Sequence, residues 1–437
     1  MPQIPALAQI LVVFALVVAA TSKKVHLGVA AGFGGVILAL WRGMPIGQVV
    51  ELSVAETFST DTLLLLFLMS MILVFSIAMK KSGAMDDFAA AIVGISPSQR
   101  SAMAIAPMLI GTLPVPGGAI LSAPLVESMD SGKERSAGTL SAANYWFRHC
   151  LELVWPLYPA FILSASLSGI PIPRLILLNL YAPPSLFILG LIFILPSKSL
   201  GAQKTQGTAA SRTSSSNARA SLAGLAPLGI VICSYVLLLP VWKILAPALG
   251  FEPVAQALLG RYIPVLAGLF LGCFYLAKTR GGFGVFKGII KPSTFALLGV
   301  IIGIRIFSSL LGAAQLPLAA AKDLQSLGIS PLLASALIPF IAGIVTGVGF
   351  GYVGLTFPIV IGMISGNPTI PFEAGIVMAG AFGYAGMMLS PLHVCMVVTA
   401  EHFHTGLAGT IRKFAIPLFL FLGIGAAYTA FLFIALK

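Results

Sequence analysis

Long apolar stretches alternate with short polar segments along the whole chain. A helix of about 20 apolar residues crosses the roughly 30 Å hydrocarbon core of a bilayer, so each long stretch predicts a membrane span. In the first half we expect spans at 5–21, 26–41, 62–79, 137–168 and 174–195. In the second half we expect them at 222–247, 262–278, 293–316, 373–400 and 413–436. The predicted fold is an all-α membrane protein with five transmembrane helices in each half.

Two of these spans contain prolines that interrupt a helix. The span 137–168 is broken near Pro156 and Pro159, and the span 373–400 is broken at Pro391. Two other segments, 101–128 and 329–364, are too rich in glycine and proline for simple spans, and each is long enough for two half-helices. We therefore expect two re-entrant hairpins, whose non-helical tips need protein or a watery cavity around them.

Composition supports the membrane class. Of 437 residues, 58% are apolar and 9% are charged, and the mean hydropathy is +1.03, all far from the values of soluble proteins. A net charge of +12 in a soluble protein would suggest nucleic acid. Here lysine and arginine lie mainly between apolar stretches, where they set membrane topology, so we expect no nucleic-acid partner.

The cysteines and the N-terminal segment carry little functional signal. The four cysteines lie inside apolar segments without paired metal-ligand spacing, which favours small core residues over disulfides or a metal site. The first 20 residues lack a basic region and a convincing cleavage site. They predict a first membrane helix and no removable signal.

The second half repeats the plan of the first. The segment 111–126 has a counterpart at 343–360, in which Thr356 stands opposite Ser122 at an offset of 356 − 122 = 234. Two further matches keep nearly the same offset: Pro156-Leu157 with Pro391-Leu392 at 235, and Val74-Phe75-Ser76 with Ile306-Phe307-Ser308 at 232. An odd number of crossings in each half reverses the orientation. We predict two inverted-topology repeats, residues 1–197 and 222–437, joined by a linker at 198–221.

The linker orients the predicted spans. It carries Lys198, Lys204, Arg212 and Arg219 without an acidic residue, so it should be flexible and cytoplasmic. The loop expected at 42–61 would face the opposite side, with Arg42 against three acidic residues. Both termini then lie outside, the first hairpin opens from the cytoplasm, and the second opens from the exterior.

The hairpin tips can bind ions through the backbone. Glycines in 114–118 and 346–354 permit sharp turns and close approach to a ligand. N-termini of half-helices attract anions, and unwound carbonyls suit cations. Close helix packing through small residues is the alternative explanation. At these tips and on the matched hairpin arms we expect substrate contacts from Pro116, Gly117, Gly118, Ser122, Thr346, Gly349, Gly351 and Thr356.

Arg305 lies inside the apolar span 293–316. An arginine at membrane depth costs at least roughly 2.5 kcal/mol on insertion scales, so it normally faces a cavity or a partner. Guanidinium matches carboxylate geometry, which favours a role in binding an anionic substrate. A structural arginine, paired with backbone carbonyls or with Glu152, is the alternative.

Further polar candidates lie on the two interrupted spans. Arg148 and Glu152 are four residues apart, so on one helix they would share a face and could form an internal ion pair. In the functional alternative, Arg148 contacts substrate and Glu152 carries a proton or cation. His393 stands beside the second break, where either packing or substrate contact fits. Asn144, Tyr158 and His393 complete the expected substrate contacts, and Glu152, His149 and Ser390 are the candidates for ion coupling.

These features resemble a known group. Two inverted five-span repeats, each with a re-entrant hairpin and an interrupted helix, are similar to the ion transporter superfamily, which includes dicarboxylate, citrate and gluconate permeases. The segments PVPGGAILSAPLVE and NYWFRHCLELVWPLYPAFILSASLSGIP resemble an uncharacterised bacterial and archaeal integral-membrane family of that superfamily. The resemblance implies a homodimer in which a scaffold holds a moving transport part that carries substrate by an elevator-like motion.

The sequence therefore predicts a secondary active transporter of the cytoplasmic (inner) membrane. Its partners would be a small organic anion, the bilayer and a second copy of the chain, with Na⁺ or H⁺ as coupling ion and no cofactor. One alternative is a cation/proton antiporter that uses Glu152 and His393, with Arg305 as a structural counter-charge. Another is an intramembrane enzyme, against which stand the lack of an HExxH motif, a nucleophile elbow and paired membrane aspartates.

Overall fold

The computed structural model describes residues 4–87, 98–112, 119–130, 134–197, 215–288, 292–365, 367 and 369–436, and over these ranges it contains helices and no strands. The helices of the first half are α1 (Ala6–Ser22), α2 (Leu27–Trp41), α3 (Ile46–Thr57), α4 (Thr60–Lys81), α6 (Gln99–Gly111), α7 (Ala119–Ser128), α8 (Ala137–Arg148), α9 (Pro159–Ser168), α10 (Ile172–Asn179) and α11 (Ala182–Phe193). Those of the second half are α12 (Ser215–Ala248), α13 (Pro253–Thr279), the 3₁₀ helix η1 (Gly282–Phe286), α14 (Pro292–Ala313), α15 (Leu316–Ser326), α16 (Pro331–Thr346), α17 (Gly349–Ser365), α18 (Phe372–Leu389), α19 (Val394–His402) and α20 (Leu407–Ala435).

The chain is a multi-pass membrane protein. Within the described ranges, seven helical segments are long and apolar enough to cross a bilayer. They are Thr60–Lys81, Ile172–Phe193, Ala226–Ala248, Pro253–Thr279, Thr294–Ala313, Phe372–His402 and Leu407–Ala435. Large apolar side chains such as Leu237, Phe274 and Ile434 point outward. Such surface is rare on soluble monomers and fits contact with lipid.

Every predicted span overlaps at least one helix, and both predicted interruptions are present. The first lies between α8 and α9, where Pro159 is the first residue of α9. Proline suits that position because the first N–H of a helix has no partner within it. The second lies between α18 and α19 and contains Pro391. The residue before a proline avoids helical geometry, so α18 ends at Leu389.

Two predicted segments differ from the structure. The expected loop at 42–61 contains helix α3 and the start of α4. Ile46, Val50 and Val54 recur every four residues on α3 and are exposed, so this short helix presents an outward apolar stripe. The expected linker at 198–221 ends in helix, because α12 begins at Ser215 and its first turns contain good helix formers such as Ala218 and Ala220. Residues 198–214 lie outside the described ranges.

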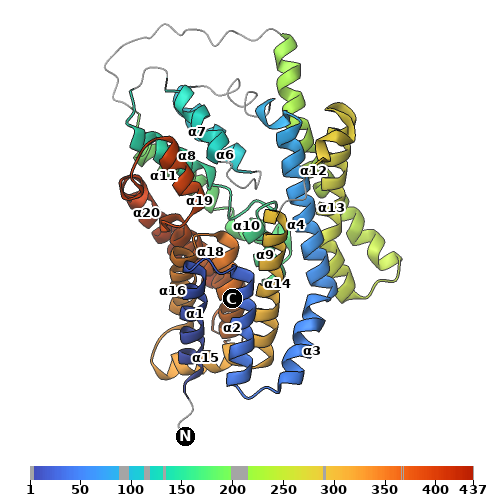
Figure 1. The fold of residues 1–437 in the computed structure, drawn as a ribbon, viewed down its shortest axis with the longest axis vertical. Coiled ribbons are helices and arrows are strands. Elements are labelled where there is room, and N and C mark those ends of the chain that lie inside the picture. The colour runs from blue at the N-terminus through green and yellow to red at the C-terminus, as the bar shows by residue number, and fades with distance from the viewer. Residues whose placement is uncertain are drawn as a thin grey trace.

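The helices pack as two connected groups (Figure 1). In one group, α13 packs against α4 and α12. In the other, α14 packs against α2, and α16 packs against α17 and α18. In the view of Figure 1, α6 and α7 lie near the upper end of the molecule and α15 and α16 near the lower end. The breaks of the α8–α9 and α18–α19 segments meet inside the protein, because the buried rings of His149 and His393 lie with their centroids 4.8 Å apart.

Glycines bring α6 and α16 each against one break. A Cβ on Gly111, the last residue of α6, would lie 2.1 Å from the carbonyl oxygen of Arg148. Gly347 follows α16 with φ of +64°, and a Cβ there would lie 2.9 Å from the backbone nitrogen of His393. Only glycine permits both the positive φ and the close contact. Close backbone packing therefore occurs at the start of the first break and at the end of the second.

Candidate functional site

A cavity of about 430 Å³ lies where the two helix breaks meet. Its walls come from α4, α6, α8, α9, α14, α17, α18 and α19 and from the two breaks, so both halves of the chain contribute. The polar or titratable side chains that line the cavity are those of His26, Arg148, His149, Glu152, Tyr158, Thr294, His393 and Cys395. A mostly apolar cavity with a few convergent polar groups is the usual form of a small-molecule site.

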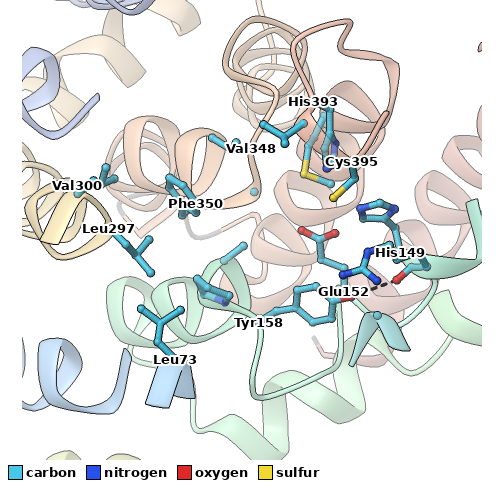
Figure 2. Close-up of a pocket in the computed structure, with 18 of the residues that line it drawn as sticks. Leu73, His149, Glu152, Tyr158, Leu297, Val300, Val348, Phe350, His393 and Cys395 are labelled. Carbon is cyan, nitrogen blue, oxygen red and sulfur yellow. Dashed lines mark hydrogen bonds between the residues drawn. The ribbon is translucent and has the colours of Figure 1, made fainter. Parts of the chain in front are cut away.

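The polar groups at the two breaks gather on one side of the cavity, whereas His26 and Thr294 belong to the opposite wall, at α14. Figure 2 shows His149, Glu152, His393 and Cys395 close together, with Leu73, Leu297, Val300 and Phe350 across the cavity. The apolar wall comes from α4, α14 and the start of α17. A ligand here would place its charged group on the break side and its apolar part on the opposite wall.

Arg148 is the cation of the site. It ends α8, and its side chain is only 4% exposed. Its Nη1 atom has no hydrogen-bond partner in the described part of the chain. Its carbonyl oxygen accepts a hydrogen bond of 3.1 Å from the Tyr158 hydroxyl, drawn in Figure 2, so the backbone beneath the guanidinium is held in place. A buried guanidinium donor without a partner is costly, and an anionic ligand would satisfy it.

Glu152 is buried in the same wall, 7% exposed. The ion pair with Arg148, one of the two alternatives that the sequence leaves open, is absent: across the described residues, the Glu152 carboxylate accepts no hydrogen bond and forms no ion pair within 4.0 Å. The expectation of a shared helix face was wrong because α8 ends at Arg148 and Glu152 lies in the break. A Cβ on Gly349 would lie 2.7 Å from Glu152 Oε1, so the start of α17 closes directly over this carboxylate.

The two histidines contact the same tyrosine. His149 Nδ1 lies 2.7 Å from the carbonyl oxygen of Tyr145. His393 Nδ1 lies 3.0 Å from the Tyr145 hydroxyl, which also lies 3.2 Å from the carbonyl oxygen of Met388. The imidazole rings meet edge to face with centroids 4.8 Å apart. Tyr145, on α8, therefore connects the two breaks.

Cys395 is one of three polar lining residues that sequence reasoning missed; the other two are His26 and Thr294. The apolar surroundings of Cys395 in the sequence favour a small core residue, but it lines the cavity in the first turn of α19. Its sulfur and a nitrogen of each histidine, His149 and His393, lie within 4.8 Å of one another. The available signal was its position two residues after His393, at a break that was already predicted.

Arg305 lies away from the cavity and forms ion pairs with two acidic side chains. Its Nη2 atom is 2.6 Å from Glu56 Oε1 and 3.0 Å from Asp61 Oδ2. Its Nε atom donates to the hydroxyl of Thr62 at 3.0 Å. The geometry matches a structural arginine, with Glu56 and Asp61 as partners in place of the carbonyls or Glu152 considered from the sequence. The central-cavity position expected for Arg305 is therefore not found.

The remaining candidates divide by position. Arg148, His149, Glu152, Tyr158, Gly349 and His393 line the cavity. Ser122, Asn144, Thr346, Gly351, Thr356, Ser390 and Arg305 are not among the lining residues. Pro116, Gly117 and Gly118 lie outside the described residues.

Several of the residues off the cavity hold elements together. The Asn144 amide donates to the Thr399 hydroxyl at 3.0 Å and joins α8 to α19. Ser390 donates to the carbonyl oxygen of Ile344 at 2.5 Å, which ties the second break to α16. The hydroxyls of Thr346 and Thr356 donate to carbonyls within their own helices, those of Ala342 and Tyr352. Ser122 is fully buried.

Comparison with known proteins supports a membrane-transporter fold. The family model described as "Protein of unknown function (DUF401)" matches residues 6–251 and 271–434. The chain belongs to this family. No curated protein matches the sequence. The crystal structure of the Alcanivorax borkumensis YdaH transporter is similar to this DUF401 protein, with a TM-score of 0.51 and 15% identity over 84% of each chain. At this identity the likeness is one of fold.

Gly347 provides a test of the packing that positions His393. Gly347→Ala should lower stability by more than the roughly 1 kcal/mol that a left-handed conformation costs an alanine, because its Cβ would also press on the backbone of Leu392 and His393. Thermal unfolding in detergent measures the loss.

Gly169→Ala is the matched control. Gly169 has φ of +71° and open space around it, so it carries the conformational cost without the contact. Equal destabilisation by the two substitutions would contradict a packing role for Gly347.

Proposed function

We propose that this DUF401 protein is a secondary active transporter of a small organic anion coupled to Na⁺ or H⁺. The observation that carries the proposal is Arg148, a buried cation with an unpartnered Nη1 atom in the wall of an apolar cavity. A carboxylate ligand would accept its hydrogen bonds, while the wall of Leu297, Val300 and Phe350 would pack against the ligand's apolar part.

An inverted-repeat architecture is part of the proposal. Pairwise packing supports it: α2 with α14 corresponds to α13 with α4, and α6 with α8 corresponds to α16 with α18. The close contact of Gly111 with the carbonyl oxygen of Arg148 likewise corresponds to that of Gly343 with the carbonyl oxygen of Gly383. Binding between discontinuous helices of two inverted repeats is a common transporter design.

Motion and assembly follow from this architecture. Helices α6 to α9 and α16 to α19 would move as one transport part against a scaffold that contains α1, α2, α12 and α13, in a homodimer. The protein would lie in the cytoplasmic membrane with both termini outside and the 198–221 segment inside. This orientation rests on the basic, acid-free composition of that segment.

The test begins with purified full-length protein. Thermal unfolding is screened against a library of small carboxylates, sulfonates and phosphates, with and without Na⁺. A ligand that stabilises the protein is then used in uptake assays with proteoliposomes under Na⁺ or proton gradients. We expect saturable, gradient-driven uptake of an anion. Uptake of a ligand without any dependence on either gradient would contradict secondary transport.

Glu152 supports a second candidate, cation/proton antiport. Its carboxylate is buried beside the cavity without an ion-pair partner among the described residues, as a proton or Na⁺ carrier would be. Arg305, ion-paired with Glu56 and Asp61, fits the structural counter-charge of that alternative. Cation exchange in proteoliposomes without any anion would favour antiport.

Glu152 should couple the ion gradient to movement of the substrate. In Glu152→Gln we expect exchange of substrate across proteoliposomes to continue, but accumulation driven by the gradient to stop, because the amide carries no charge to neutralise. Glu373→Gln is the control, since Glu373 binds the exposed Arg174 away from the cavity. Normal accumulation by Glu152→Gln would rule out the coupling role.

A further inference from the structure

The cavity contains a set of side chains that anion transport does not require. His149, His393 and Cys395 present two imidazoles and a thiol, and one ligand atom from each lies within 4.8 Å of the other two. They come from both breaks of the fold: His149 follows α8, and the other two residues stand at the start of α19. All three line the same cavity.

We propose that His149, His393 and Cys395 form a binding site for a transition-metal ion of the Zn²⁺ class. Tetrahedral zinc holds nitrogen at about 2.0–2.1 Å and sulfur at about 2.3 Å, which places ligand atoms roughly 3.3–3.6 Å apart. Closing the present separation requires movement of about 1 Å by side chains that already border an open space. Imidazole and thiolate select zinc-like ions over Na⁺, Mg²⁺ and Ca²⁺, which prefer oxygen.

Tyr145 supplies the outer support that metal-binding histidines need. The Tyr145 carbonyl can only accept, so the proton of His149 is on Nδ1 and the lone pair of Nε2 is available. The Tyr145 hydroxyl can donate to the Met388 carbonyl and accept from His393 Nδ1, which leaves Nε2 of His393 available as well. Such hydrogen bonds fix the tautomer and orientation of ligating histidines. Tyr145 is completely buried, so both contacts are protected from water.

The neighbouring charges define how the site is completed. Arg148 and Glu152 balance each other in the wall. A divalent ion with the Cys395 thiolate adds one net positive charge, which an anion in the cavity would neutralise. Three protein ligands also leave one position of a tetrahedral ion open, as in sites that bind an exchangeable fourth ligand. The metal site thus goes beyond the proposed anion transport, which Arg148 alone can support.

Metal binding is measured on the full-length protein after removal of any affinity tag and stripping with a chelator. Equilibrium dialysis with Zn²⁺ gives affinity and stoichiometry, and Co²⁺ gives a spectrum that reports thiolate and tetrahedral coordination. We expect one ion per chain at this site and a thiolate-to-Co²⁺ absorption band. Cys395→Ser should abolish that band, and His393→Gln should abolish tight binding.

Tyr145→Phe separates outer support from direct ligation. It keeps the carbonyl that holds His149 and removes the hydroxyl that holds His393, so Zn²⁺ affinity should fall about ten- to a hundredfold with the band retained. The controls are Cys233→Ser and His402→Asn. Cys233 is an exposed thiol elsewhere, and His402 contacts Glu127 at the surface. Both controls should bind as the unaltered protein does.

Two results would overturn the site. One is the absence of micromolar or tighter Zn²⁺ binding by the unaltered protein, and the other is an unchanged Co²⁺ spectrum in folded Cys395→Ser. If Cys395→Ser does not fold, alkylation of Cys395 in the unaltered protein decides: protection by Zn²⁺ supports the site, and no protection contradicts it. Anion uptake measured in chelator tests the transport proposal separately.

Discussion

Replacing Arg148 by leucine should weaken binding of the transported anion about ten- to a hundredfold and abolish its uptake. A hydrogen bond to a charged group contributes about 1.5–3 kcal/mol, and each 1.4 kcal/mol is a factor of ten in affinity. Because Nη1 of Arg148 has no hydrogen-bond partner among the described residues, leucine removes a buried donor that is unsatisfied in the ligand-free protein. The same change leaves the buried Glu152 carboxylate without the neighbouring positive charge, so the two effects oppose each other and the melting temperature of the ligand-free protein should change little.

Two further variants sharpen this experiment. Arg148→Lys keeps the charge but not the planar fork of donors, so it should restore binding only in part. Arg174→Ala is the control, because Arg174 forms an exposed ion pair with Glu373 at 2.5 Å and should leave anion affinity unchanged. Unaltered affinity in Arg148→Leu would contradict the proposed anion site. A large loss of stability would instead identify Arg148 as a structural residue.

The sequence predicted much of the fold because membrane spans depend on simple physical requirements. Apolar length and interrupting prolines are local properties, so the spans and the breaks at Pro159 and Pro391 could be located. Helix α3 was missed because its acidic residues and short length resemble a loop, and its amphipathic period extends over only a few turns. The start of α12 was missed because the basic, serine-rich composition outweighed helix propensity over a few residues.

Site residues could be predicted from the sequence where they lie beside a helix break, because the prolines that cause the break are visible in the sequence. Arg148, Glu152 and His393 were selected for their positions beside interruptions, and all three line the cavity. Pairing between distant segments was not predictable. Cys395 meets His149 across the two halves of the chain, so no local spacing indicates a cluster. Arg305 forms ion pairs with Glu56 and Asp61, which stand more than 240 residues earlier, on helices α3 and α4.

We expect Arg305 to stabilise the folded protein. It belongs to a half-buried network with two arginines and two carboxylates: Arg305 contacts Glu56 and Asp61, and Arg261 lies 3.6 Å from Asp61. Tyr262 donates to Asp61 at 2.6 Å, which links α13 to α4 within the same network. The charges balance, so removal of one arginine leaves an uncompensated carboxylate in a poorly solvated place.

Arg305→Met should therefore destabilise the protein by roughly 3 kcal/mol, the low end for broken buried pairs because the network is partly exposed. Arg305→Met combined with Glu56→Gln restores the charge balance and should recover part of the loss. Chemical unfolding in detergent measures both effects, and anion affinity is measured on whatever fraction remains folded. We expect that affinity to be unchanged, since Arg305 does not line the cavity. Loss of anion binding without loss of stability would return Arg305 to the substrate site and place a second cation in the transport path.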